Sequence, residues 1–256
     1  MDTYGCGCQH NCSYCYARSL LHFRGLWNAA EPRIADLKKI KRKIKTLPPG
    51  SILRLGGMTD CFQPCEQIYR ATYQTIEWLN QQRVGYLIVT KSALVAAPDY
   101  LKILDKELAH IQITVTCLDD HYSETFEKAS PPSQRIKAIF ALQSAGFDVS
   151  IRLSPMVEEF MDIDALNALG IEKCVIEFLR VNSWIRQWLQ GVDFSKYTIR
   201  QSGYYHLPLS EKQRIVEKIR IREKTVCDDV TEHYLFWKEN VNPNKEDCCN
   251  LRIART

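Results

Sequence analysis

Residues 8–15 of this 256-residue chain read Cys8-Gln9-His10-Asn11-Cys12-Ser13-Tyr14-Cys15 and place three thiols within one short loop. A loop of this length cannot bury three cysteines separately, so ligands are a better interpretation than core residues. Thiolates are soft ligands that suit iron–sulfur clusters, zinc or Cu(I). A cluster that only carries electrons is usually held by four cysteines. Three thiolates therefore predict a [4Fe–4S] cluster on Cys8, Cys12 and Cys15 with one iron open to another molecule.

A zinc site is the alternative for the same thiols. Structural zinc takes four ligands, and Cys6 or His10 could supply the fourth. A non-catalytic iron–sulfur or zinc protein, serving electron transfer or assembly, would follow from such a closed site. An open iron argues against that function, because a coordination position is then kept for a reactant.

Around this loop, apolar runs alternate with amphipathic stretches. Strands are expected at 51–55, 85–90, 111–117, 149–153 and 174–178, with a short first strand near residues 1–4, and helices at 33–45, 67–80, 100–108, 133–145 and 163–169. This alternation is typical of a parallel sheet with helices outside. About six units are fewer than the eight of a closed barrel. We therefore predict an α/β fold, a partial (β/α)6 TIM-like barrel, with chemistry at the carboxyl ends of its strands.

The tail has a different pattern. Ser210-Glu211-Lys212-Gln213 has the form of a capping box and predicts a helix from there to about Lys224. No low-complexity linker separates it from the rest of the chain. We expect a barrel core over residues 1–200 and a short C-terminal extension, residues 201–256, packed on that core.

Composition limits the class of protein. Hydrophobic residues make up 45% and charged residues 25%, as in soluble globular proteins. The net charge of +4 and the pI of about 8.4 are too mild for a dedicated nucleic-acid binder. The eleven cysteines are odd in number, and neither an apolar signal segment nor a membrane-length apolar window is visible. Reduced thiols in a soluble, cytoplasmic protein are expected.

The Cys-x3-Cys-x2-Cys spacing, with the aromatic Tyr14 before the last cysteine, resembles the radical S-adenosylmethionine (radical SAM) superfamily. The resemblance implies a [4Fe–4S] cluster whose open iron binds SAM. One-electron reduction, by a donor such as flavodoxin or ferredoxin, then cleaves SAM to methionine and a 5′-deoxyadenosyl radical that abstracts a substrate hydrogen. In such an enzyme the cofactor performs the difficult chemistry, and the protein binds and orients the reactants.

Further motifs resemble the spore photoproduct lyase-like branch of that superfamily. They are Tyr4 with Cys8, then 15–18, 57–66, 90–92, 127–135 and 152–155, and together they cover roughly residues 1–160. The resemblance implies that Tyr14 belongs to the cofactor site and that the SAM amino group is held by Gly56, Gly57, Met58, Thr59 and Asp60. It makes Lys91, Ser92, Arg152 and Ser154 candidates for the SAM carboxylate or ribose.

The other cysteines have several interpretations. Photoproduct lyases use a cysteine near the second-strand element as a hydrogen-atom donor, which makes Cys61 the catalytic candidate, with a buried inert thiol as the alternative. Cys117 and Cys174 lie inside expected strands and are interpreted as core residues. The tail cysteines Cys227, Cys248 and Cys249 could hold an auxiliary cluster or zinc, contact substrate or donate hydrogen, or be inert.

The first function hypothesis is a radical SAM lyase that breaks a C–N or C–C bond in a small nucleobase-like substrate. The chain resembles a queuine lyase, which would yield 7-aminomethyl-7-deazaguanine. A carboxylate can accept from both donors of a guanine-like edge, and the candidates are Asp60, Asp119, Asp120, Glu158 and Glu159, with a surface or helix-capping role as the alternative for each. The second hypothesis is photoproduct repair in DNA. We expect no membrane association and no tight nucleic-acid binding, because the basic helix at 36–45 would give only weak, salt-sensitive attraction.

Overall fold

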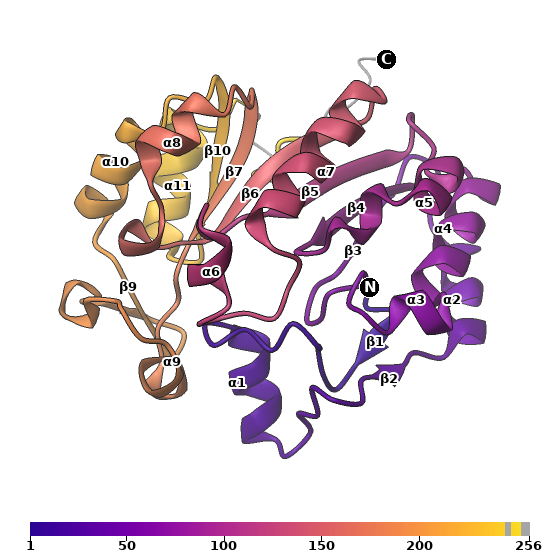
Figure 1. Ribbon diagram of the computed structural model, residues 1–256, viewed down its shortest axis with the longest axis horizontal. Coiled ribbons are helices and arrows are strands. Elements are labelled where there is room, and N and C mark those ends of the chain that lie inside the picture. Colours follow the sequence, from indigo (N-terminus) through magenta and orange to yellow (C-terminus); the bar gives the residue numbers. More distant parts are fainter. Residues whose placement is uncertain (244–246, 252–256) are drawn as a thin grey trace.

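A parallel sheet of six strands forms the centre of the computed structural model, which describes residues 1–243 and 247–251 (Figure 1). Each strand of this sheet lies beside the sheet strand that comes next along the chain. In order, the strands are β3 (Ile52–Leu55), β4 (Gly85–Thr90), β5 (Ala109–Thr114), β6 (Asp148–Met156), β7 (Lys173–Phe178) and β10 (Glu223–Cys227). The sheet does not close between β3 and β10, which confirms the predicted partial barrel.

Helices connect these strands and cover the sheet (Figure 1). Helix α7 packs on β5 and β6, α4 packs on β4, and α11 packs on β10. The helices are α1 (Tyr16–Phe23), α2 (Leu37–Ile44), α3 (Glu66–Tyr69), α4 (Ala71–Gln81), α5 (Pro98–Ile103), α6 (Asp120–Ser123), α7 (Pro132–Ser144), α8 (Ile163–Ala168), α9 (Ser183–Trp188), α10 (Leu209–Lys218) and α11 (Thr231–Asn240), with short 3-10 turns η1 (Ala93–Ala96), η2 (Glu158–Phe160) and η3 (Phe194–Lys196).

The strand expected near residues 1–4 is not part of the central sheet. Strand β1 (Tyr4–Gly5) instead pairs antiparallel with β2 (Arg33–Ile34), and a second small pair joins β8 (Ile199–Gln201) to β9 (Tyr204–His206). The sixth strand of the sheet is β10, which pairs with β7. The division of the chain at residue 200 stays a prediction, and it has to accommodate a strand from the extension within the sheet of the core.

The helix predicted to reach Lys224 ends earlier. Helix α10 begins after Pro208 and stops at Lys218, and no side-chain cap forms at its start. Lys224 belongs to β10, and its ammonium donates to the carbonyls of Val216 and Ile219 at 3.1 and 2.6 Å. A lysine at this place satisfies carbonyls that the end of a helix leaves unpaired. The sequence assigned Lys224 to the end of the helix. In the structure it lies on the following strand, and its ammonium caps that helix.

The predicted helix at 67–80 is interrupted at Arg70, which adopts a left-handed conformation with φ of 54° between α3 and α4. The buried carboxylate of Glu66 accepts from the backbone N–H groups of Thr72 and Tyr73, both at 2.9 Å. A carboxylate at this place satisfies the first free N–H groups of α4. The side chain of Glu66, which lies one residue before the predicted helix, thus starts the second helix.

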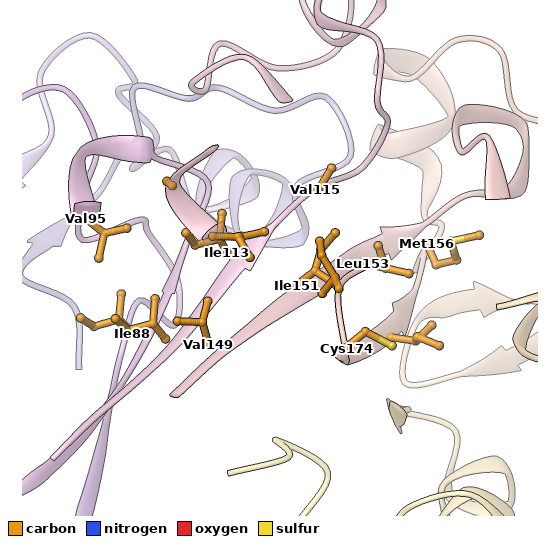
Figure 2. Close-up of a cluster of buried hydrophobic side chains, with 14 of the residues drawn as sticks. Ile88, Val95, Ile113, Val115, Val149, Ile151, Leu153, Met156 and Cys174 are labelled. Carbon is orange, nitrogen blue, oxygen red and sulfur yellow. The ribbon is translucent and has the colours of Figure 1, made fainter. Parts of the chain in front are cut away.

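Alternation along the strands separates core from pocket. Figure 2 shows apolar side chains from successive strands packed together, among them Ile113, Ile151 and Cys174. The residues next to them, Thr114 and Arg152, line a pocket on the opposite face of the sheet. Side chains alternate between the two faces of a strand, so one strand supplies both a hydrophobic core and a polar site. Cys174 and Cys117 are buried, as predicted for core residues.

Within residues 1–243 and 247–251, no helix has the length and apolar character needed to cross a membrane.

Candidate active site

One pocket, with a volume of about 260 Å³, lies at the carboxyl ends of the strands. It brings together the cluster loop, the turn after β3 and the ends of β4, β6, β7 and β10. Predicted site residues that line it are Cys8, Cys12, Tyr14, Cys15, Gly56, Gly57, Met58, Thr59, Asp60, Lys91, Arg152 and Ser154. The carboxyl edge of a parallel sheet is where ligands bind in such folds.

The cluster loop is fixed by the segment that precedes α7. The Ser13 N–H donates to the carbonyl of Phe126 at 2.8 Å, and the Lys128 N–H donates to the carbonyl of His10 at 2.7 Å. At the end of the loop, Cys15 is the N-cap of α1 and accepts from the Arg18 N–H at 3.3 Å. These bonds hold a loop that has no regular secondary structure of its own.

A buried ion pair stands behind the loop. Glu127 pairs with Arg135, and the hydroxyl of Tyr14 donates to the same carboxylate. The guanidinium of Arg135 also donates to the carbonyl of Thr114 at 2.9 Å. Burial alone would raise the pKa of Glu127, but the charge of Arg135 holds that pKa below its ordinary value. Tyr14, which the motif predicts beside the cofactor, is thus connected through Glu127 to β5 and α7.

The three thiols suit a group that carries positive charge. Cys8, Cys12 and Cys15 are free cysteines on the wall of one pocket. Burial raises the pKa of Cys8 to about 12 and also raises the pKa of Cys12 and Cys15. Thiolates at these places need nearby cations, and bound metal deprotonates a coordinating thiol. The donor set therefore fits an iron–sulfur cluster.

A single metal ion makes a different demand on its ligands. Zinc needs its donor atoms around one point, and the described part of the chain, 1–243 and 247–251, contains no group of three or more His, Cys, Asp or Glu side chains arranged in this way. In a [4Fe–4S] cluster each thiolate binds a different iron, so the thiols need only surround a larger body.

The turn after β3 is built around backbone N–H groups. Asp2 accepts from the N–H groups of Gly57, Met58 and Thr59 at 2.7, 3.0 and 3.3 Å. Gly56 adopts φ of +84°, and a Cβ there would lie 2.6 Å from the carbonyl oxygen of Val89. Only glycine fits this contact without displacing β4.

Gly56→Ala is expected to destabilise the protein by about 2–4 kcal/mol, because it adds a left-handed strain and a backbone clash. Gly57→Ala is the matched control, since its Cβ would meet no atom closer than 3.7 Å. Urea unfolding of both variants measures the difference. Equal midpoints for the two variants would contradict this account.

Asp60 connects the turn to the cluster loop. It accepts from the Phe62 N–H and the Thr90 hydroxyl, both at 2.8 Å, and from the Lys91 N–H at 2.6 Å. The Nε2 of His10 lies 3.2 Å from the same carboxylate. Burial would raise the pKa of Asp60, but His10 and these N–H donors lower it. With its oxygens occupied in this way, Asp60 positions β4 and the loop rather than reading a substrate edge.

The remaining predicted residues divide between the pocket and its surroundings. Lys91 donates to the carbonyl of Ser154 at 3.2 Å and lies 5.5 Å from the ring of Tyr14. Ser92 is buried and does not line the pocket, and its hydroxyl accepts from the Leu94 N–H at 3.2 Å to cap η1. Cys61 is fully buried and is not among the lining residues. The catalytic role of Cys61 stays a prediction, and its position agrees with the alternative of an inert core thiol.

A charged wall that the sequence did not predict lines another part of the pocket. Glu177 accepts from Arg152 at 2.5 Å and from Arg180 at 2.7 Å, and Arg180 also pairs with Asp229 at 2.7 Å. Burial would raise the pKa of Glu177, but Arg152 and Arg180 lower it to about 2. Of these residues only Arg152 was predicted. The sequence held one signal for Glu177. Side chains alternate between the two faces of a strand, and Glu177 occupies one of the alternating positions of β7 that face the pocket.

Four of the five carboxylates considered for a base edge lie outside the pocket. Asp119 caps α6, Asp120 accepts from Ser133, Glu158 pairs with Arg214 and Lys218, and Glu159 pairs with Lys196. These four therefore have the surface or helix-capping roles that the sequence offered as the alternative to substrate contact. They follow strands in sequence, but each is used by a nearby helix end or a surface cation.

The tail brings its three cysteines to the end of β10. Cys227 lines the pocket, and Cys248 Sγ donates to Cys227 Sγ at 3.1 Å. Gln112 donates to the carbonyl of Cys249 at 2.6 Å. The tail is therefore attached directly to the floor of the site.

Two curated relatives share this sequence pattern at a distance. An uncharacterised protein of Methanocaldococcus jannaschii is 26% identical over 171 residues, which cover 62% of this chain and 60% of that protein. The match thus spans less than two thirds of that relative. An uncharacterised protein of Acidianus two-tailed virus is 23% identical over 225 residues, which cover 77% of this chain and 72% of the viral protein.

Solved structures share the fold. A spore photoproduct lyase mutant with bound AdoMet and dinucleoside spore photoproduct superimposes with a TM-score of 0.64 at 15% identity, over 92% of this chain and 73% of that one. SuiB of Streptococcus suis, bound to the precursor peptide SuiA, gives a TM-score of 0.62 at 11% identity, over 93% and 50%. At these identities the likeness concerns the fold.

The match to a protein family shows where the chain belongs. The model of the radical SAM superfamily matches residues 3–167, which is more than half of the chain and includes the three-cysteine loop. Members of this superfamily use a [4Fe–4S] cluster and S-adenosylmethionine, and AdoMet is bound in structural neighbours. The predicted family and cofactors are thereby confirmed. With its thiols, glycine turn and strand ends around one pocket, the chain belongs to the radical SAM superfamily.

Proposed function

We propose that this radical SAM enzyme is a lyase that breaks a C–N or C–C bond in a small nucleobase-like substrate, with queuine as the first candidate. The observation that carries the proposal is the composition of the pocket at the carboxyl ends of the strands. Cysteines of the cluster loop line one part of it, and a wall of Glu177, Arg180 and Asp229 lines another. Cofactor chemistry and polar substrate recognition would then occur in the same cavity.

The residues proposed to hold the cluster are Cys8, Cys12 and Cys15, with the turn at 56–60 and Lys91, Arg152 and Ser154 toward SAM. When bound, the cluster and SAM supply a carbon radical able to abstract hydrogen. The chain itself contributes position, since Asp60 fixes the loop against β4 and Glu127 fixes Tyr14. An electron donor such as flavodoxin or ferredoxin, in the cytoplasm, is part of the proposal.

Asp229 is the proposed partner of the base edge. Its side chain is 43% exposed and lines the pocket, while Arg180 holds one of its oxygens at 2.7 Å. A guanine-like edge presents a ring N–H and an amine side by side, and a carboxylate accepts from both. Asp229 replaces the carboxylates that the sequence suggested, because it is the exposed acid on this wall.

Release of 5′-deoxyadenosine, measured with reductant and SAM in the presence and absence of queuine, tests the proposal. We expect queuine to stimulate release and the aminomethyl base to be produced. Asp229→Asn should lower the stimulation on the order of 10- to 100-fold, as expected for loss of a charged hydrogen bond. Asp119→Asn, a helix cap outside the pocket, should leave it unchanged.

Photoproduct repair is the second candidate. The observation that favours it is that fold neighbours named spore photoproduct lyase bind a dinucleoside spore photoproduct. It would replace queuine cleavage if the enzyme turned over a thymine photoproduct and ignored queuine. A tight complex with damaged duplex at physiological salt would support the same conclusion, since only weak binding is expected from the surface helix α2.

A further inference from the structure

The end of β10 carries three thiols that the proposed function does not use. Cys248 Sγ lies 3.1 Å from Cys227 Sγ, and both are free and partly buried. Cys249 is the next residue in the chain and is also a free thiol. The two thiols are in direct contact, so their sulfur atoms are placed to form a disulfide, and one of them lies on a pocket wall.

The surrounding contacts hold the two thiols against each other. The hydroxyl of Thr225 donates to the carbonyl of Cys248 at 2.8 Å, and Asn250 donates to the carbonyl of Glu223 at 3.2 Å. Gln112, on the inner face of β5, donates to the carbonyl of Cys249 at 2.6 Å. The segment at 247–250 is therefore tied along β10 and β5 by polar contacts, and bond formation needs no large movement of the chain.

The charges at this place differ between the two thiols. A hydrogen bond from Cys248 lowers the pKa of Cys227, and the buried guanidinium of Arg152 also favours its thiolate. Contact with Cys227 and Cys249 raises the pKa of Cys248. One thiol is thus prepared as a nucleophile and its neighbour as a proton donor, which is the arrangement that thiol–disulfide exchange requires.

We propose that Cys227 and Cys248 form a reversible dithiol–disulfide pair at the floor of the pocket, which reacts with small-molecule disulfides. The Cys227 thiolate attacks one sulfur of the small disulfide and releases one thiolate. Cys248 then gives up its proton and attacks the Cys227 sulfur, which releases the second thiol. The two cysteines lose two electrons and the small disulfide gains them, giving two small thiols.

Oxidation also has a structural consequence. Gln112 contacts both the Cys249 carbonyl and the guanidinium of Arg152, the latter at 2.7 Å. A covalent bond between Cys227 and Cys248 fixes the tail to the same strand end that Arg152 faces. The oxidation state of the pair follows the ratio of thiols to disulfides around the protein, and a change in it would act directly on the pocket wall.

The test uses the full chain with its cluster reconstituted, incubated anaerobically in mixtures of reduced and oxidised glutathione. After denaturation in N-ethylmaleimide, trypsin releases residues 225–238 and 246–252 as separate peptides, with Cys227 in the first and Cys248 and Cys249 in the second. We expect a linked pair of these peptides that appears as oxidised glutathione rises and disappears with dithiothreitol. Two fewer thiols per chain should react with maleimide.

Single-cysteine variants assign the bond. Cys248→Ser should abolish the linked peptides, and Cys249→Ser, the matched control one residue away, should retain them. Absence of linked peptides in the unchanged protein at every glutathione ratio would overturn the proposal. So would linked peptides that persist in Cys248→Ser, because the bond would then belong to Cys249.

Discussion

Cys8→Ala is expected to abolish 5′-deoxyadenosine formation and to lower the iron content of the anaerobically reconstituted protein well below about four per chain. The reason is that each of the three proposed thiolates binds a different iron, so the loss of one leaves a cluster with two open positions. Cys12→Ala and Cys15→Ala should behave in the same way. Iron analysis and the charge-transfer absorption of the cluster measure the first effect, and product analysis measures the second.

Cys6→Ala is the matched control. Cys6 lies two residues before the motif, is half-buried and does not line the pocket. Its replacement should leave iron content and product formation close to those of the unchanged protein. Product formation by Cys8→Ala, or loss of metal from Cys6→Ala, would show that the ligands are not the three proposed thiols.

Glu127→Ala is expected to lower the free energy of unfolding by about 3–5 kcal/mol, because it leaves the buried charge of Arg135 unpaired. The side chains of Arg135 and Glu127 are 0% and 1% exposed, so no solvent compensates the loss. For a chain of this size the change corresponds to a fall in melting temperature of roughly 10 °C. Tyr14 also loses its acceptor, so the cluster loop should become more sensitive to proteolysis.

Glu107→Ala removes the same type of residue from a surface pair. Glu107 lies 2.5 Å from Arg83, with side chains that are 78% and 58% exposed. Exposed pairs contribute less than about 1 kcal/mol, so this variant should unfold near the unchanged protein. Calorimetry of the two variants decides the matter, and similar melting temperatures would show that the buried pair does not anchor the loop.

The barrel could be predicted from the sequence because its inner strands are apolar and evenly spaced. Strand β4 was predicted with its observed bounds, since the apolar run at 86–89 is flanked by Gly85 and Thr90. Strand β10 could not be found in this way, because Glu223 and Lys224 lie at its start and their contacts, not their hydrophobicity, fix the strand. The short antiparallel pair β1–β2 was not predicted either, because a strand of two residues is too short to show an alternating pattern.

The site was predicted where a local motif carried it. Glycine at position 56 and the cysteines of the loop belong to compact patterns, and the structure places them in one pocket. Glu177 carries only the alternation of its strand, Arg180 and Asp229 belong to no pattern, and only the folded sheet shows that the three face the same cavity. For Asp60 the reverse holds. The sequence predicted its place in the site, but its hydrogen bonds give it a role in positioning β4 and the cluster loop instead of binding substrate.

The order of the strands has a consequence for how the protein is made. The cluster loop leaves the ribosome well before β10, whose last residue Cys227 borders the same pocket. Chains emerge at about 5–20 residues per second, so β3 to β7 are available for several seconds before their last partner strand. During this interval β7 presents an unpaired edge, which is a template for wrong association. Delivery of the cluster before β10 has emerged would therefore meet an incomplete cavity, and assembly of the cofactor in a complete site has to follow the synthesis of β10.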